Sequence, residues 1–546
     1  MLKRIFNSQS KTITGATGIL AVSSIISGLL GLLTDRFLAH RFGASMETSI
    51  YFAAFRIPDL VYNILISGGI LVAFLPIFTE YFSSDEKKAW QMTNYVLNIF
   101  FLLLVLISIA LFILTPWLIG KFILPDFSGE GKALAIILTR ILLIQPIFLG
   151  LSNIFSGVLH YFNRFLIYSL APIFYNLGII FGILFLAPYF GILGVGLGVI
   201  LGAFLHLAIQ IPSAINCGFK YEFLFNFKYP AVKKIFSLMG TRIFALSANQ
   251  INLIALTAIA SRIAEGSIAI FNYSSAIQGL PVTILGISLA TVAFPTFSRL
   301  WVNGQKKAFA EKFSQIIRQI FFLIIPASIL IFLLRAQIVR IILGTGRFGW
   351  DDTRLAAASL GLFALGIFAA TITPFLIRIF FSFQDTKIPT FTAVISAMIS
   401  IGLAFIFKSA LNSPNFFSNF ANNNLKLQGV GNIAVIGLPL AISIASILQF
   451  LLLSIFLYKK IGDFGVKEIL NSLKKILLAS ILMAEITYVS LMAAAHFVNM
   501  QTFFGVFLQA AIAGSIGILV YVLITFYLKS PEFDSFKLSI QSKFRK

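Results

Sequence analysis

Four arginines stand inside long apolar stretches of the sequence and are the side chains with the clearest chemical potential. They are Arg56, Arg140, Arg242 and Arg378. A charged side chain at the centre of a bilayer costs at least about 2.5 kcal/mol, so such residues usually face a partner charge or a water-filled cavity. Arginine stays charged, and its planar fork of donors matches the oxygens of a phosphate. These residues therefore predict a site that binds an anionic group.

Two of the four arginines have polar neighbours at helical spacing. Arg56 precedes Asp59 by about one turn, and Arg242 precedes Asn249 by seven residues, with Gln250 adjacent. Residues seven apart share a helix face. We therefore predict that Arg56, Arg242, Asn249 and Gln250 face a substrate. The competing interpretations are a surface pair of Arg56 with Asp59 and a capping contact of Arg242 near the membrane edge.

The remaining charged candidates are less specific. Arg140, in ILTRILL, faces either the cavity or the outer headgroups, to which long side chains can extend. Asp35 is a candidate ion-pair partner for Arg36 or for a cavity arginine, and the alternative is a solvated helix end. Arg378 lies close to the end of its segment, and we expect it to be structural.

The composition indicates that the chain is an integral membrane protein. Of 546 residues, 59% are hydrophobic and 11% are charged, and the mean hydropathy is +0.96. A soluble domain carries about 25% charged residues. The net charge of +22 then reflects membrane topology, and nucleic acid is not needed to explain it.

Covalent chemistry finds no support in the sequence. The single cysteine, Cys217, and four scattered histidines offer no metal-ligand spacing. HExxH, GxSxG and GxxxxGK[ST] motifs are absent from the sequence. We expect no enzyme, no metal and no cofactor, and a driving ion or membrane potential stays open because no carboxylate pair specifies an ion site.

About fourteen segments reach the roughly 20 apolar residues that a spanning helix needs. With the N-terminus inside, most of the 41 Lys and Arg residues fall on the side of the two termini. The positive-inside rule then places both termini in the cytoplasm. The predicted fold is an all-α, multi-pass membrane protein.

A duplication divides the chain. VAFLPIFTEYF (72–82) is echoed by VAFPTFSRL (292–300), and NRFLIYSLAP (163–172) by FSFQDTKIP (381–389), both about 220 residues later. An even number of helices per copy gives parallel repeats, a known transporter plan that holds substrate between the halves. The predicted parts are a six-helix lobe at 13–213, a cytoplasmic linker at 214–231, a second six-helix lobe at 232–458 and two additional helices at 469–528.

Several runs resemble the MurJ/MviN family of lipid II flippases, within the multidrug/oligosaccharidyl-lipid/polysaccharide exporter superfamily. They are FGASMETSIYFAAFRIPDLV (42–61), VAFLPIFTEY (72–81), NRFLIYSLAPIFYNLGII (163–180), FPTFS (294–298), GTGRFGWDDT (344–353) and FSFQDTKIPT (381–390). The resemblance implies two lobes around a central cavity, a lipid-tail groove at the last two helices, and alternating access.

The chain departs from the family pattern at charged cavity positions. Gly28 and Thr34 stand where the family has arginines, while Asp35 is retained. Ser49, Tyr62 and Ser67 replace an acid, an arginine and a glutamate in the second helix. Ser274, Ser275 and Gln278 replace an acid, an arginine and a glutamate in the eighth, and we include Ser275 and Gln278 among the predicted substrate-binding residues.

The leading hypothesis is a flippase of the bacterial cytoplasmic membrane that moves lipid II outward for peptidoglycan synthesis, and so supports cell-wall growth and cell shape. Its predicted partners are an undecaprenyl-pyrophosphate glycan, membrane lipids and other cell-wall proteins. Two alternatives stay open: transport of another polyprenyl-linked glycan or amphipathic molecule, and a non-transporting scaffold for cell-wall synthesis.

Overall fold

The computed structural model describes residues 13–65 and 71–534, and this part of the chain is helical without a β-strand. Eleven helices in it are long and apolar enough to cross a membrane, and α18 and α19, bent by 49°, together make a twelfth. The all-α, multi-pass class is therefore confirmed. The two predicted spans outside this set are 47–79, which is broken into short helices, and 232–262, which forms one helix.

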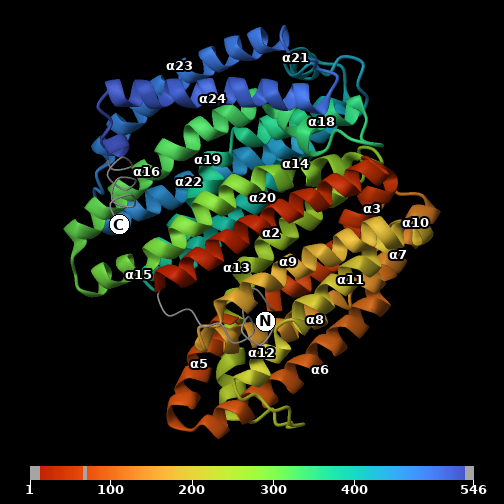
Figure 1. Ribbon diagram of the computed structural model, residues 1–546, viewed down its shortest axis with the longest axis vertical. Helices are drawn as coiled ribbons and strands as arrows, with labels where there is room; N and C mark the ends of the chain where they lie inside the picture. The colour runs from red at the N-terminus through yellow and green to blue at the C-terminus, as the bar shows by residue number, and fades with distance from the viewer. Residues whose placement is uncertain (1–12, 66–70, 535–546) are drawn as a thin grey trace. The chain divides into compact units, whose positions relative to one another are not determined.

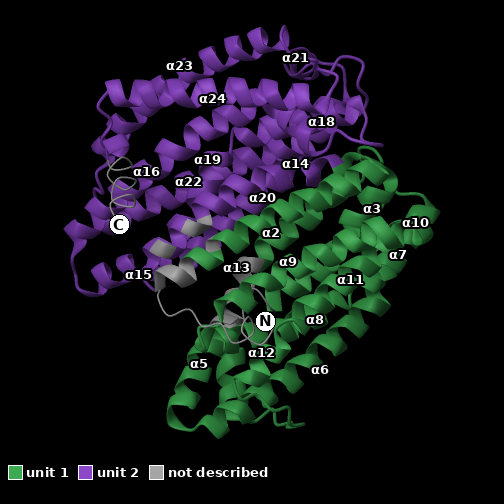
Figure 2. Cartoon of the chain, viewed as in Figure 1, with its two compact units in different colours: residues 1–269 green, residues 270–546 purple. Residues whose placement is uncertain are grey.

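The described chain divides into two compact units, residues 1–269 and 270–546 (Figure 2). The boundary falls at the start of α14, later than the predicted linker at 214–231. The predicted bounds of the two lobes come from the duplication in the sequence, and they remain a prediction.

The labelled elements of the first unit are twelve α-helices and two π-helical segments, and residues 62–65 are also π-helical. They are α2 (Ile13–Phe42), α3 (Met46–Ala54), α4 (Arg56–Val61), α5 (Leu71–Ser84), α6 (Glu86–Leu118), η2 (Ile119–Ile123), α7 (Gly129–Leu142), α8 (Gln145–Tyr161), α9 (Phe165–Phe181), η3 (Gly182–Leu186), α10 (Ala187–Phe190), α11 (Ile192–Ala208), α12 (Ile211–Asn216) and α13 (Pro230–Ala260).

The second unit takes all of the following elements except the first residues of α14. They are α14 (Ser267–Pro281), η4 (Val282–Ile287), α15 (Ser288–Val302), α16 (Lys306–Leu333), α17 (Arg335–Ile342), α18 (Trp350–Ala364), α19 (Ile367–Ser382), α20 (Lys387–Asn412), α21 (Phe416–Leu425), η5 (Ile433–Ile436), α22 (Gly437–Ile461), α23 (Val466–Ala495) and α24 (Phe503–Tyr527). Figure 1 shows α23 and α24 side by side.

Glycines allow the backbones of two helices to approach closely in the first unit, where α9 and η3 pack on α11. A Cβ built on Gly178 would lie 2.3 Å from the Cα of Gly202, and one on Gly182 would lie 2.6 Å from the Cα of Gly198. Lipid supplies little hydrophobic drive between helices, so close backbone approach takes its place. Gly198 and Gly202, four residues apart, thus form a packing face on α11.

Aromatic side chains fill the core of the second unit. Phe297 of α15 packs on Phe309 of α16 with ring centroids 4.8 Å apart, and Phe313 stacks on Phe375 of α19 at 5.7 Å. Edge-on and offset ring pairs of this kind add about 0.5–1.5 kcal/mol beyond area burial. This core fixes the relative positions of α15, α16 and α19.

Candidate substrate-binding site

Arg56 is a buried cation that links two helices of the first unit. Helix α3 ends at Ala54, and Phe55 interrupts the helix. Helix α4 begins at Arg56, two residues before Pro58. The Arg56 side chain is 8% exposed, and its Nε donates to Oγ1 of Thr257 on α13 at 2.7 Å. Asp59 lies one turn further along α4, on the same helix face. The guanidinium is thus fixed between α4 and α13, and its planar fork of N–H donors is the group that suits an anion at this position.

Three tyrosines, Tyr51, Tyr62 and Tyr175, lie within electrostatic range of Asp59. The buried Tyr51 of α3 interacts electrostatically with Asp35 and Asp59, and Tyr175 of α9 with Asp59, Tyr51 and Tyr62. The structure thus brings the predicted residue Asp35 into the same neighbourhood as Asp59, which Arg56 precedes on α4. Arg56 can attract a phosphorylated headgroup by charge, and tyrosine hydroxyls can donate hydrogen bonds to its oxygens.

Sequence reasoning missed Gln145, Tyr51 and Tyr175 as members of this site. Gln145 on α8 donates from Nε2 to the hydroxyl of Tyr175 at 3.0 Å. Tyr175 stands in the run NRFLIYSLAPIFYNLGII, which resembles the family. Tyr51 stands in another resembling run, FGASMETSIYFAAFRIPDLV, and Gln145 stands in none of them. Apart from these runs no local pattern distinguished the three residues, because buried tyrosines are common in helix packing.

The polar residues of α13 divide between two faces of the helix. Gln250 is buried and lies seven residues before Thr257, so it shares the face that meets Arg56. The neighbouring Asn249 is exposed. The side chain of Arg242 lies outside the described residues.

Arg140 contacts an aromatic side chain of a neighbouring helix. Its guanidinium carbon lies 4.4 Å from the centre of the Phe112 ring on α6, and its Nε donates to the Phe112 carbonyl at 3.2 Å. A cation over an aromatic face gains roughly 0.5–2 kcal/mol. The structure therefore places Arg140 in a contact between α7 and α6, whereas its predicted role in binding substrate stays untested.

The eighth-helix candidates belong to α14 in the second unit, where Ser275 and Gln278 are half-buried. Their neighbour Ser274 donates to the carbonyls of Ile270 and Ala356, at 2.8 and 3.1 Å, and so joins α14 to α18. Arg378 of α19 donates from Nη1 to Oγ1 of Thr291 on α15, in line with the structural role expected for it.

Ser49 stands at a position where the resemblance implies an acid, and it makes hydrogen bonds to the backbone of a neighbouring segment. Ser49 donates to the carbonyl of Glu265, and the N–H of Ala269 donates to Ser49 Oγ at 3.4 Å. Both this residue and Ser274 satisfy backbone groups. At both positions, where the resemblance implies an acid, the serine makes a hydrogen-bonded packing contact.

An apolar groove of about 900 Å³ runs along the second unit. Its walls come from α16, α19, α22 and α23, with Ser328 and Ser454 as its hydroxyl-bearing residues. Aromatic and aliphatic side chains make up most of the lining, for example Phe321, Phe450 and Leu470. A groove of this composition fits a hydrocarbon chain. Within the described residues α23 contributes to its lining, and α24 packs behind α23.

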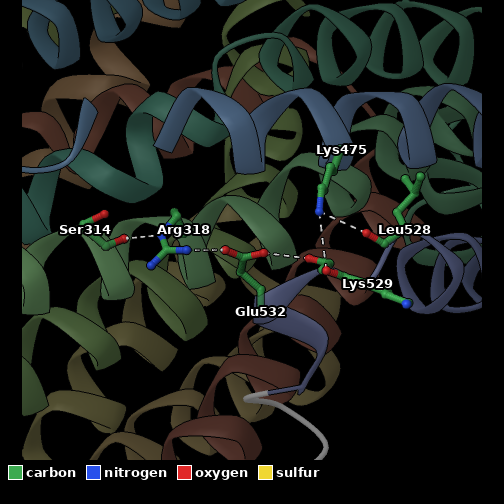
Figure 3. A network of polar contacts seen from close by, with 7 residues as sticks. Ser314, Arg318, Lys475, Leu528, Lys529 and Glu532 are labelled. Carbon is green, nitrogen blue, oxygen red and sulfur yellow. Dashed lines mark hydrogen bonds and ion pairs between the residues drawn. The ribbon is translucent and has the colours of Figure 1, made fainter. Parts of the chain in front are cut away.

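A polar network joins the C-terminal end of α24 to α16 beside one end of the groove (Figure 3). Arg318 Nη1 lies 3.1 Å from Glu532 Oε1, and Ser530 donates to Glu532 Oε2 at 2.6 Å. Lys475 of α23 donates to the carbonyls of Leu528 and Lys529, at 3.0 and 3.4 Å. We call this set of residues the C-terminal latch. It fixes α23 and α24 against α16.

The fold is that of the MurJ-like and MATE-like transporters. A solved structure titled as an inward-facing multidrug resistance MATE family transporter of the MOP superfamily covers 82% of this chain and 98% of its own, with a TM-score of 0.65 at 15% identity. A structure titled "Lipid II flippase MurJ, inward closed conformation" covers 93% and 98%, with a TM-score of 0.73 at 25% identity.

Sequence comparison then defines the family. The family model described as "Lipid II flippase MurJ" matches residues 38–508. A protein of Buchnera aphidicola subsp. Acyrthosiphon pisum described as "Probable lipid II flippase MurJ" is 30% identical over 485 residues, covering 86% of this chain and 89% of its own. A protein of Vibrio cholerae with the same description is 28% identical over 442 residues, covering 77% and 84%. The chain belongs to the lipid II flippase MurJ family.

Proposed function

We propose that this chain moves lipid II from the inner to the outer leaflet of the bacterial cytoplasmic membrane, with both termini in the cytoplasm. The observation that carries the proposal is the buried Arg56, seated on Thr257 in an otherwise apolar, multi-pass protein. A pyrophosphate needs a cationic partner to enter such an environment. Membership of the MurJ family supports lipid II as the cargo.

The proposed mechanism uses binding and conformational change without a covalent step. Arg56 pairs with the pyrophosphate, while the hydroxyls of Tyr51 and Tyr175 orient the headgroup. The polyprenyl tail stays in hydrocarbon along the groove lined by α16 and α23, so only the headgroup crosses the membrane. Alternating access of the two predicted lobes then exposes the headgroup to the outside. The driving force is a coupling ion or the membrane potential.

The proposal is tested by complementing cells depleted of their own lipid II flippase. The wild-type chain should restore lipid II that an externally added, membrane-impermeant probe can reach. Arg56→Ala should abolish this signal at equal membrane insertion. Arg347→Ala, the same change at an exposed arginine, should not. Failure of the inserted wild-type chain would reject lipid II transport and favour the scaffold alternative, and full activity of Arg56→Ala would refute the role of Arg56 in binding the pyrophosphate.

A further inference from the structure

The segment between α12 and α13 contains neither helix nor strand, and it carries four exposed aromatic side chains at every second position. Tyr221, Phe223, Phe225 and Phe227 are 60%, 78%, 43% and 54% exposed. Successive side chains of an extended chain point to opposite sides, so residues two apart share a side. The rings of Phe225 and Phe227 are in edge-on contact, with their centroids 5.1 Å apart, so these two side chains lie on the same side of the segment. We call these four residues the aromatic stripe.

The segment is held along α6 by two asparagines. Asn94 Nδ2 donates to the Lys220 carbonyl at 2.9 Å, and Asn94 Oδ1 accepts from the N–H of Glu222 at 3.1 Å. Asn98 Nδ2 donates to the carbonyls of Glu222 and Leu224, at 3.2 and 3.0 Å. The backbone is therefore fixed, while the rings of the aromatic stripe stay largely uncovered by the protein.

Both ends of the segment are also packed. Phe219 is buried edge-on against Trp90, with ring centroids 6.0 Å apart. Tyr229 stacks on Tyr95 at 4.5 Å. Exposure of the aromatic stripe is thus a property of an ordered segment with anchored ends.

The position of Asn98 in α6 fixes the depth of the segment. The helix opens with the polar sequence EKKAWQMTNYVLN, and from Ile99 to Leu118 it carries no charged residue. The uncharged apolar run of a spanning helix occupies the hydrocarbon, whose thickness is about 30 Å. Asn94 and Asn98 therefore lie where the hydrocarbon meets the headgroups. Aromatic side chains are enriched at this level of membrane proteins.

An apolar pocket of about 500 Å³ opens beside the start of the segment. Its lining is aliphatic and aromatic except for Lys220 and the hydroxyl of Tyr221. Lys228 is exposed at the other end of the aromatic stripe. This combination of an apolar pocket with a cation at its margin matches an acyl chain that carries a phosphate.

We propose that residues 219–229 form an interfacial membrane anchor that binds anionic phospholipid of the adjacent leaflet. The aromatic stripe lies among the headgroups, Lys220 and Lys228 pair with lipid phosphates, and the pocket receives an acyl chain. Exposed lysines near an anionic leaflet strengthen binding to it. The anchor holds the chain between α12 and α13 at the membrane surface, and it does not depend on the identity of the transported lipid.

Spin-label accessibility tests the depth and the alternation together. In a Cys217→Ser background of the full chain, nitroxides are placed by Phe223→Cys and Phe225→Cys on the stripe, and by Glu222→Cys and Asn226→Cys on the other side. In vesicles of phosphatidylglycerol and phosphatidylcholine, labels at 223 and 225 should collide more often with oxygen and less often with a water-soluble nickel chelate than labels at 222 and 226.

Equal accessibility at all four positions would overturn the anchor. So would protection of 223 and 225 that appears in native membranes and not in pure lipid vesicles, because the stripe would then bind a protein.

A second measurement tests the lysines. Native mass spectrometry of the purified chain with phosphatidylglycerol should show affinity falling roughly fivefold for each of Lys220→Ala and Lys228→Ala. The matched pair Lys87→Ala and Lys88→Ala, exposed at the start of α6, should leave affinity unchanged. Equal losses in both pairs would overturn the assignment of the phosphate to Lys220 and Lys228.

Discussion

The C-terminal latch makes a quantitative prediction about stability. Glu532 is 3% exposed and Arg318 is 22% exposed in their ion pair. Removing one partner of a buried pair costs about 3–5 kcal/mol, because the other charge stays buried without compensation. Since Arg318 retains some access to water and a bond to the Ser314 carbonyl, we expect the lower end for Glu532→Ala, about 3 kcal/mol.

A double-mutant cycle in lipid nanodiscs measures this prediction. The free energy of unfolding is compared for Glu532→Ala, Arg318→Ala and the double variant, and the coupling energy isolates the pair. Replacing both by Leu and Met should restore stability to within about 1 kcal/mol of the wild type, because apolar packing substitutes well for a buried ion pair.

The exposed pair of Asp351 with Arg354 is the matched control. Asp351 is 68% exposed, and its loss should cost below about 1 kcal/mol. A Glu532→Ala effect no larger than that of Asp351→Ala would refute the assignment of the latch as a buried, stabilising pair.

Three further variants address other features. Thr257→Val removes an acceptor of Arg56 and should lower transport by roughly 10-fold, since hydrogen bonds to charged groups contribute about 1.5–3 kcal/mol, as initial rates of lipid II appearance would show. Gly178→Leu forces a side chain into backbone 2.3 Å away and should destabilise the protein by about 3 kcal/mol or more in thermal unfolding. Burial acts to raise the pKa of Asp385, but hydrogen bonds from Lys460 and from backbone N–H groups outweigh it and hold that pKa below its ordinary value. The ionised carboxylate thus stabilises the fold above the unfolded pKa of about 3.9. This contribution is lost as the pH falls through the lower folded pKa, and Asp385→Asn should remove this part of the acid dependence of the melting temperature.

Each of these predictions has a contrary outcome. Wild-type rates in Thr257→Val would mean that the threonine does not support Arg56. Gly120→Leu, where a Cβ meets nothing within 4 Å, should be tolerated, and an equal loss there would discredit the close-packing argument. An unchanged acid profile in Asp385→Asn would show that its ion pair does not contribute to folding.

Composition and segment length were sufficient to predict the fold class, because the bilayer restricts a chain of this hydropathy to helices of a defined length. The same filter predicted one continuous span at 47–79, and the structure shows α3, α4 and α5 there. Pro58 lacks the N–H that would bond the Ala54 carbonyl, and its ring crowds that carbonyl, which accounts for the break at Phe55.

The site was predictable only where a charge interrupts apolar sequence. Arg56 stands out for this reason, and the structure finds it buried. Its partner Thr257 lies 201 residues away, and a threonine in a helix has no distinctive local pattern. Tyr51 and Tyr175 were missed for the same reason, since their role comes from tertiary proximity to Asp59.

The wall of the apolar groove is attached at two levels. At one end the C-terminal latch ties α24 to α16, and further along Gln337 of α17 donates to Gln509 of α24 at 3.0 Å, while Gln509 donates to the Leu491 carbonyl of α23. Because α24 is held at both ends, this wall of the groove is fixed and does not rotate about one end. A polyprenyl chain would therefore enter the groove laterally from the lipid. The width of the groove would stay constant while the headgroup crosses the membrane.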